Sequence, residues 1–465
     1  MKKILVVLPT PLMARNFLGS DILKLLGAGM KTVIMVVSPN PDDRKVAEEL
    51  GARWYPYFHP RRSREPGDQS VFAILMRRGR YIRYLVGLFV HMCLTYRFNT
   101  IASFEGFKAR LRQTFALRKA YLREGLPMSL IFGFPWPHNK TIYRFLFQIY
   151  YRNWQGFGPV EKLVTDFKPD LMVLSMIQTH MVTPYVLAAK RCNVQILGIN
   201  GSWDQPTTKG PLCPGIGRIA VQNDIVRNEL VLHHGISLEK IKTIGWLQMD
   251  SYFGVRQVRR EDLFASTGIP IERRYILFAA NAPRLGVHEP AIFSQLANLV
   301  CADQFGPDVT LICRCHPQDR DWRVRWGWAI GLKRVVVEPP DLGPLDHLAA
   351  LIQHASVVIA SAGSINLDAV ALDTPTIGLA WEDKGLPYWD RPARAYELEH
   401  LVGLRRDPGM NFACNLEELV AACSRYLEDR DADALGRESL RQRYLYRLDG
   451  GAAARLATEI KEMLA

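Results

Sequence analysis

The segment from Val357 to Leu379 constrains the fold of this chain more than any other. It reads VVIASAGSINLDAVALDTPTIGL: a short apolar run, a turn of small residues, a stretch with helical spacing, an Asp-Thr-Pro stop and a second apolar run. A short, unbroken apolar run is typical of a strand that is buried on both faces of a parallel sheet. Two such runs joined by a helix predict a β-α-β unit, and therefore a domain of the α/β class.

The turn in this unit, Ser361-Ala362-Gly363-Ser364, lies at the start of the predicted helix. Small residues let backbone N–H groups approach an anion closely, and the positive end of the helix dipole favours a phosphate there. An ordinary strand-to-helix turn is the alternative. We expect Ser361, Gly363 and Ser364 to bind the diphosphate of a nucleotide donor through N–H and hydroxyl groups.

Alternation of apolar runs with helical spacing recurs in two series along the chain. In the first series we predict strands at 3–8, 32–37, 52–55, 171–175, 194–199, 218–222 and 241–244, and helices at 17–30, 42–50, 160–167, 182–191 and 224–233. In the second we predict strands at 275–279, 309–314, 335–337, 357–360 and 376–379, and helices at 290–302, 345–354, 365–372, 416–428 and 440–464.

The two series predict two tandem Rossmann-like domains facing a cleft, with ligands at the carboxyl ends of the parallel strands. We expect an N-terminal domain at 1–250, which carries an insertion at about 60–155. A C-terminal domain that binds the nucleotide donor is expected at 251–445, followed by a C-terminal helix at 446–465.

The insertion carries the whole excess of positive charge. Residues 61–152 contain 17 Lys or Arg and four acidic residues, an excess that equals the net charge of the chain, +13, and they are rich in aromatic rings. Bases interleaved with rings suit an anionic membrane surface. Single-stranded nucleic acid is a second possible partner, and a helical insertion with a solvated basic face is a third reading. We expect the membrane surface and no nucleic acid, because no recognised nucleic-acid-binding module occurs.

Other patterns exclude several classes of protein. The eight cysteines form no C-x-x-C pair, which favours reduced thiols in a cytoplasm. No apolar run reaches the roughly 18 residues of a membrane span, and the N-terminus favours a first strand over a signal peptide. The Asp319-Arg320-Asp321 motif does not end a buried strand of the first domain, so we expect no metal. No G-x-G-x-x-G follows the first strand, so we expect no bound cofactor of the NAD type.

Several segments together resemble the GT-B glycosyltransferases, especially those of bacterial surface-polysaccharide synthesis. The related CDP-glycerol-type polyol-phosphate transferases and the non-hydrolysing nucleotide-sugar epimerases share this resemblance. The segments are SWDQPTTKG at Ser202–Gly210, the stretch Ala220–Asp250, Cys315-His316-Pro317 and Asp449-Gly450-Gly451, besides the turn at Ser361. The resemblance covers about residues 1–55 and 160–465 and leaves out the basic insertion.

The resemblance implies roles for residues of the second domain. Asp368 matches the family's acidic residue that accepts hydrogen bonds from ribose or sugar hydroxyls; a favourable charge near a helix N-terminus is the alternative. Arg284 and His316 would contact phosphate or sugar oxygens. The alternatives are a solvent-facing arginine and a structural His-Pro turn. Glu382 follows the strand after the turn and would contact the sugar, unless it is merely solvated.

The first domain would supply the acceptor site and the general base, which takes the proton of the attacking hydroxyl in an inverting transfer. Asp204 follows the strand 194–199 and His180 follows the strand 171–175, so both are candidates. Arg15 and Asn16, placed in the loop after the first strand, are expected to bind donor phosphate or acceptor.

These expectations combine into a metal-independent glycosyltransferase, peripheral on the cytoplasmic face of the membrane. It would move a sugar from a nucleotide-diphosphate donor to a lipid-linked or surface-glycan acceptor. A polyol-phosphate transferase with a CDP-activated donor and a soluble nucleotide-sugar epimerase are the alternatives.

Overall fold

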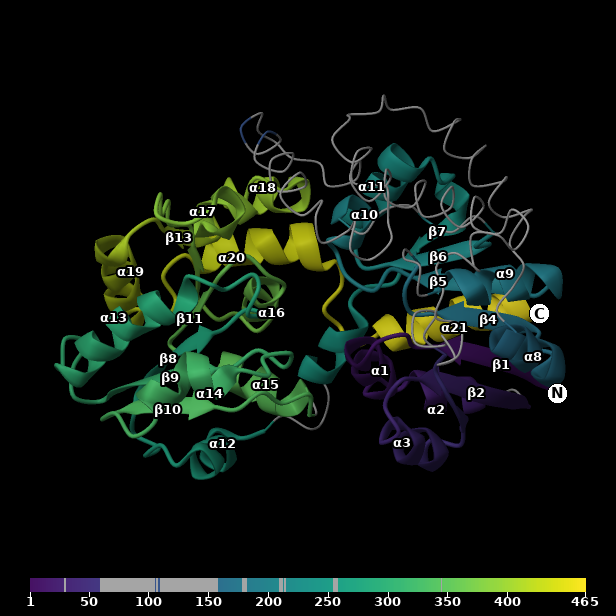
Figure 1. The fold of residues 1–465 in the computed structure, drawn as a ribbon, viewed down its shortest axis with the longest axis horizontal. Coiled ribbons are helices and arrows are strands. Elements are labelled where there is room, and N and C mark those ends of the chain that lie inside the picture. Colours follow the sequence, from purple (N-terminus) through teal and green to yellow (C-terminus); the bar gives the residue numbers. More distant parts are fainter. Residues whose placement is uncertain are drawn as a thin grey trace, which may run out of the picture. The chain divides into compact units, whose positions relative to one another are not determined.

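The computed structural model describes residues 1–28, 31–58, 105, 108, 158–177, 182–208, 212, 215–253, 258–343 and 345–465. Two compact units divide the chain (Figure 1). Unit 1 holds the described residues of 1–58 and 158–245 together with Ala452–Ala465, and unit 2 holds those of Trp246–Gly451. Apart from residues 105 and 108, the basic aromatic insertion predicted at about 60–155 lies outside the described residues.

Unit 1 is built on a parallel sheet of seven strands in the order β3-β2-β1-β4-β5-β6-β7. Its strands are β1 (Lys2–Val7), β2 (Thr32–Ser38), β3 (Arg53–Pro56), β4 (Leu171–Leu174), β5 (Gln195–Ile199), β6 (Arg218–Val221) and β7 (Ile241–Thr243). Its described helices include α1 (Pro11–Leu18), α2 (Ile22–Gly27), α3 (Asp43–Glu49), α8 (Gly158–Phe167), α9 (Thr183–Arg191), α10 (Gln205–Thr208), α11 (Asp224–His234) and α21 (Ala452–Leu464).

The first helix differs from the one predicted at 17–30. Helix α1 begins at Pro11, directly after β1, and a second helix, α2, follows it. Thr10 caps α1, because its hydroxyl accepts from the Met13 N–H at 3.2 Å, and Pro11 occupies a position where a missing N–H is harmless. The Thr-Pro pair is therefore a helix start, which shortens the loop after β1.

Unit 2 repeats this plan with a parallel sheet of six strands in the order β10-β9-β8-β11-β12-β13. Its strands are β8 (Arg274–Ala279), β9 (Val309–Arg314), β10 (Val335–Glu338), β11 (Val357–Ala360), β12 (Thr376–Leu379) and β13 (Asn411–Ala413). Its described helices include α12 (Arg260–Thr267), α13 (Glu289–Cys301), α14 (Trp322–Trp326), α15 (Leu345–Gln353), α16 (Ile365–Ala371), α17 (Pro392–Ala395), α18 (Glu399–Arg405), α19 (Leu416–Glu428) and α20 (Ala434–Leu440).

In both units the third, second, first and fourth strands lie in that order, which is the Rossmann arrangement. The predicted α/β class with two tandem Rossmann-like domains is confirmed. The strand order reverses between β1 and β4 in unit 1 and between β8 and β11 in unit 2. Ligands of such sheets bind at the carboxyl ends of the strands beside this switch point.

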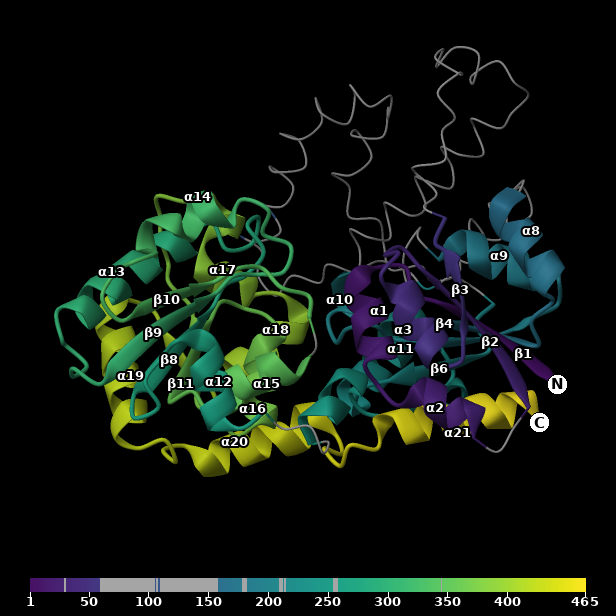
Figure 2. The same ribbon diagram turned by 90° about the horizontal axis from the view of Figure 1, so that it is seen from below.

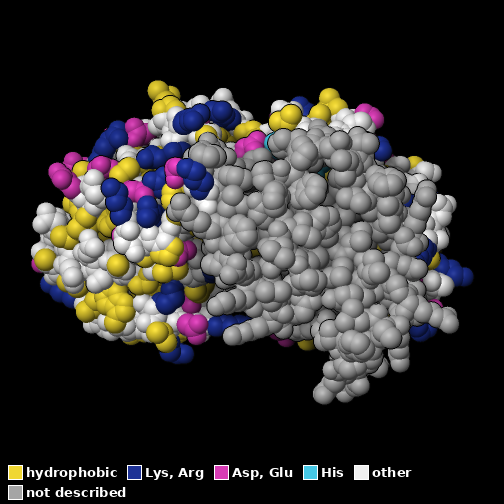
Figure 3. Space-filling model, turned by 45° about the horizontal axis from the view of Figure 1, so that its top comes forward, with side chains coloured by type: hydrophobic (Ala, Val, Ile, Leu, Met, Phe, Trp, Pro, Cys, Tyr) yellow, Lys and Arg dark blue, Asp and Glu magenta, His cyan; other side chains and the backbone are white. Residues whose placement is uncertain are grey.

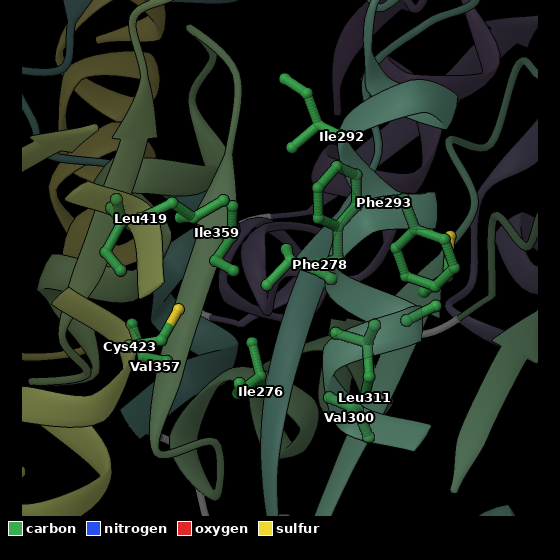
Figure 4. Packing of buried hydrophobic residues seen from close by; sticks show 14 of the residues in the cluster. Ile276, Phe278, Ile292, Phe293, Val300, Leu311, Val357, Ile359, Leu419 and Cys423 are labelled. Atoms are coloured by element: carbon green, nitrogen blue, oxygen red, sulfur yellow. The ribbon is translucent and has the colours of Figure 1, made fainter. Parts of the chain in front are cut away.

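The core of unit 2 fills the space between its sheet and the covering helices (Figure 4). Phe278 of β8 lies edge-on to Phe293 of α13, with ring centroids 5.2 Å apart, and Trp326 meets Phe293 at 5.6 Å. Ile359 of β11 belongs to the same cluster and is fully buried. This packing fixes β8, β11 and α13 against one another, so the loops that leave them have defined starting points.

The C-terminal region is not the single helix predicted at 440–464. Helix α20 ends at Leu440, a π-helical turn covers Arg441–Leu445, and α21 begins at Ala452. Tyr446, directly after this turn, adopts a φ of +58°, which lies outside the right-handed helical region and ends the helix there. Helix α21 then packs beside α2 in unit 1 (Figure 2).

No helix in the described part of the chain is long and apolar enough to span a membrane.

Candidate functional site

The turn after β11 lies at the switch point of unit 2. A buried amide, Asn366, holds its shape: the side-chain N–H of Asn366 donates to the Ser361 carbonyl at 3.0 Å, and its oxygen accepts from the Thr376 hydroxyl at 2.8 Å. Thr376 belongs to β12, so the turn is fastened to the neighbouring strand. The turn itself is only half-buried from 362 to 364.

The outer side of this turn presents unused hydrogen-bond donors. In the described part of the chain, the four successive backbone N–H groups of residues 362–365 meet no acceptor. A Cβ added to Gly363 would meet only the Ser361 carbonyl oxygen, at 3.8 Å, so the space before the turn is open. An open row of N–H donors at the end of a parallel strand is suited to an anion.

The loop after β8 lies beside the turn after β11, on the other side of the switch point. The Asn281 side-chain N–H donates to the Ala362 carbonyl at 3.2 Å, which ties this loop to the turn after β11. The Asn281 backbone N–H donates to the Glu289 carboxylate, at 2.9 Å and 3.1 Å to its two oxygens. The two loops that flank the switch point therefore share one set of hydrogen bonds.

A buried polar network lies directly beneath the turn. The Ser361 hydroxyl donates to Glu289 Oε1 at 2.7 Å and lies 2.9 Å from His288 Nε2. All three side chains are buried. Burial raises the pKa of Glu289 to about 7, against the opposing hydrogen bonds from Ser361 and Asn281. Burial lowers the pKa of His288 to about 4.

Arg325 connects this network to the loop after β9. Its guanidinium lies 3.5 Å from Glu289 Oε2 and 2.5 Å from Asp319 Oδ2, and both carboxylates are buried. The Trp326 indole N–H also donates to Asp319, at 3.2 Å. Asp319 is thus a structural partner of α14.

The predicted donor-binding residues lie at the carboxyl edge of this sheet. Gly363 and Ser364 are on the open side of the turn, whereas the Ser361 hydroxyl faces the buried network. Asp368 is buried one turn into α16, where the Tyr252 hydroxyl donates to its Oδ1 at 3.0 Å. The carboxylate is therefore oriented by a residue outside the sheet.

The remaining three follow β8, β9 and β12. Arg284 is exposed in the loop after β8. His316 is half-buried after β9; its Nδ1 accepts from the Gln318 N–H at 3.1 Å, and burial lowers its pKa. Glu382, after β12, pairs with Arg391 at 2.7 Å and also with Arg394, and these guanidinium groups lower its pKa against the effect of burial.

In unit 1, Asp204 lies in the loop after β5, at the carboxyl edge of that sheet. Its Oδ2 accepts from the Thr208 hydroxyl at 2.8 Å, and its backbone carbonyl accepts from the Thr208 N–H at 3.0 Å in the short helix α10. The preceding Gly201 is closely surrounded: a Cβ there would lie 2.8 Å from Met13 Sδ and 2.9 Å from the Ser175 carbonyl oxygen. The loops after β4 and β5 and helix α1 therefore meet around Gly201, three residues before Asp204.

Arg15 and Asn16 lie on α1 and not in a loop, because the helix begins at Pro11. The Arg15 guanidinium donates to the Asn16 side-chain oxygen at 3.2 Å and 3.3 Å. His180, the second candidate base, lies outside the described residues.

Sequence reasoning missed the buried network under the turn. His288 and Glu289 open α13, and a Glu in the first turn of a helix is common for reasons of helix dipole alone. Only the register between α13 and the Ser361 turn shows that the carboxylate points inward. Among the described residues, no three or more His, Cys, Asp or Glu side chains are placed to hold a metal ion.

No protein-family model and no curated protein sequence matches this chain. Solved structures do match over its whole length. The S. aureus MnaA–UDP co-structure has a TM-score of 0.57 at 13% identity and covers 100% of this chain and 97% of its own. The UDP-GlcNAc 2-epimerase of Methanocaldococcus jannaschii has a TM-score of 0.54 at 13% identity, with 99% of this chain and 100% of its own covered.

A glycosyltransferase from Rickettsia africae also matches, with a TM-score of 0.50 at 10% identity and a coverage of 100% of this chain and 98% of its own. Identities this low establish the fold. The chain thus has the GT-B-like fold, with two Rossmann-like domains, that is found in nucleotide-sugar epimerases and glycosyltransferases.

Proposed function

We propose that this protein is a glycosyltransferase that uses a nucleotide-diphosphate sugar. The observation that carries the proposal is the open row of N–H groups at residues 362–365, at the switch point of the second domain. A diphosphate is the anion that suits such a row, since several oxygens can accept in succession. UDP and UDP-GlcNAc, the ligands bound in structures with this fold, support a nucleotide-sugar donor.

The residues around the turn would divide the recognition of the donor. Gly363 and Ser364 would bind the diphosphate, and Arg284 would add a positive charge from the opposite loop. Asp368, oriented by Tyr252, would accept from the ribose or sugar hydroxyls. Glu382 and His316 would contact the sugar and phosphate from the neighbouring loops. Ser361 would act indirectly, because its hydroxyl holds the turn to Glu289.

The acceptor and the general base would belong to unit 1. Asp204 is the candidate base, and the Thr208 hydroxyl fixes the orientation of its carboxylate. His180 is the second candidate, and Arg15 and Asn16 would contact acceptor or donor phosphate. The transfer would need no metal and no bound cofactor. The acceptor would be a lipid-linked or surface glycan at the cytoplasmic face of the membrane, where the basic insertion meets anionic lipid.

A nucleotide-sugar epimerase is the second candidate, and the UDP-GlcNAc 2-epimerases among the matching structures favour it. A CDP-polyol-dependent transferase remains the third. Donor screening by thermal shift separates these: stabilisation by a nucleotide sugar supports either of the first two, and stabilisation by CDP-polyols alone supports the third. Conversion of the nucleotide sugar to its epimer without any acceptor would then identify the epimerase and contradict our proposal.

Two variants test the assignments within the site. Gly363→Asp places a carboxylate before the open N–H groups, so we expect it to abolish the donor-induced thermal shift. Gly27→Asp, at an open position in unit 1, is the control and should leave this shift unchanged. Asp204→Asn keeps the shape of the side chain and should reduce transfer by about a hundredfold or more while donor binding persists. Transfer at the wild-type rate would exclude Asp204 as the base.

A further inference from the structure

Five large apolar side chains in two segments of unit 2 are exposed to solvent. Leu285 and Val287, after β8, are 59% and 51% exposed, and Val324, Trp328 and Ile330, in and after α14, are 84%, 43% and 57% exposed. We call these five residues the carboxyl-edge patch. Figure 3 shows hydrophobic side chains gathered on the visible face of unit 2, at the left of the picture, with Lys and Arg side chains near them. Such gathering is unusual for a surface that meets only water.

Arg325 brings the two segments of the patch together. Its Nη2 donates to the carbonyl of Gly286 at 2.7 Å, and Gly286 lies between Leu285 and Val287. The backbone carbonyl of Arg325 accepts from the Trp328 indole N–H at 2.9 Å. Arg325 therefore ties both segments to the buried carboxylates of Glu289 and Asp319.

Positive charge borders the patch. Arg284, Arg320 and Arg323 are all exposed, and none of them forms an ion pair with the described part of the chain. The guanidinium of Arg323 lies over the Trp322 ring at 4.6 Å, which keeps it beside the apolar surface. Asp321 is the one exposed acid in the stretches 284–287 and 320–330. Apolar side chains bordered by unpaired guanidinium groups are complementary to an anionic bilayer, where apolar groups enter the interface and phosphates meet the bases.

We propose that the carboxyl-edge patch docks on an anionic lipid bilayer, with Val324 and Trp328 entering the headgroup region and Arg320 and Arg323 contacting lipid phosphates. The proposal rests on the proposed function, to which it adds a membrane-binding face separate from the basic insertion. The residues of the patch follow β8 and β9 in the chain, and these strands end at the same edge of the sheet as the turn at 362–365. Docking through it would hold the donor turn close to a lipid-linked acceptor.

Cosedimentation of the full chain with vesicles tests the proposal. Wild type should bind vesicles of phosphatidylglycerol and phosphatidylcholine, and bind phosphatidylcholine alone much more weakly. Val324→Glu should lower the partition coefficient on anionic vesicles by about tenfold, and Arg320→Gln and Arg323→Gln by about fivefold each. Leu435→Glu is the matched control, because Leu435 is 90% exposed on α20 of the same unit; it should bind like wild type.

The outcomes separate this proposal from the proposed function, because vesicle binding needs no donor and the donor-induced thermal shift needs no vesicle. Equal vesicle binding by Val324→Glu and wild type would overturn the docking surface and leave the nucleotide-sugar site standing. A wild-type dimer that Val324→Glu dissociates, with vesicle binding unchanged, would also overturn it and assign the patch to a second copy of the chain. All these side chains are exposed, and an unchanged melting temperature checks that each variant folds.

Discussion

The buried pair His288 and Glu289 makes a sharp prediction about stability and pH. The pKa of Glu289 is raised from 4.5 to about 7 by burial, so between these values the folded state binds a proton that the unfolded state has lost. Its contribution to stability is therefore full below about pH 4.5 and decreases as the pH rises through 7. A rise of about 2.5 units corresponds to about 3 kcal/mol in the free energy of unfolding.

His288 acts in the opposite direction over nearly the same range. Its pKa falls from 6.5 to about 4, so the unfolded state binds the proton first, and stability is lost as the pH falls from 6.5 towards 4. This change is also about 3 kcal/mol. In wild type the two residues change the free energy of unfolding with pH in opposite directions. The pH dependence of wild-type stability therefore shows neither contribution by itself.

Glu289→Gln separates the two slopes, because the amide keeps the size of the side chain and does not titrate. We expect the wild-type free energy of unfolding minus that of the variant to decrease by about 3 kcal/mol between pH 4.5 and 8. Urea unfolding followed by fluorescence and circular dichroism at several pH values measures this difference. Glu272→Gln, at an exposed position of unit 2, is the control and should give a constant difference. A constant difference for Glu289→Gln as well would refute the reasoning.

Three further substitutions test the packing described above. Gly201→Ala should destabilise the protein by about 1–3 kcal/mol in urea unfolding, because its methyl group overlaps neighbours within 3 Å, whereas Gly27→Ala has open space and should not. Tyr252→Phe removes the hydroxyl donor of the buried Asp368 and should lower the free energy of unfolding by about 1–3 kcal/mol; no change would show that this hydrogen bond is dispensable. Arg437→Met removes a buried guanidinium that donates to the backbone carbonyls of Ala432 and Arg430, and it should lower the melting temperature by several degrees, measured by calorimetry.

The alternation of strands and helices was readable because parallel strands in this fold are buried on both faces. The predicted bounds of β9 and α19 agree with the structure residue for residue, since an unbroken apolar run and a long amphipathic stretch leave little choice. The strand β13 was missed because it has three residues, Asn411–Ala413, too few for any periodicity.

The candidate site was only partly readable for a different reason. The turn at Ser361 has a local signature, so its place at the end of β11 followed from the sequence. The partners of its hydroxyl, His288 and Glu289, lie more than 70 residues away, and local composition does not report such contacts. The direction of the Ser361 side chain, towards the protein and not towards solvent, therefore needed the structure.

The assignment of α21 to unit 1 has a consequence for biosynthesis. Its buried face includes Leu456, Ile460 and Leu464, and Glu459 pairs with Arg218 of β6 at 2.6 Å. A ribosome delivers this helix only after all of unit 2 has been made. Until α21 has been synthesised, the apolar surface of unit 1 beside α2 therefore stays exposed while the second domain emerges and folds. We expect a chaperone to bind this surface during translation. Unit 1 can complete its fold only after the whole of unit 2 has been synthesised.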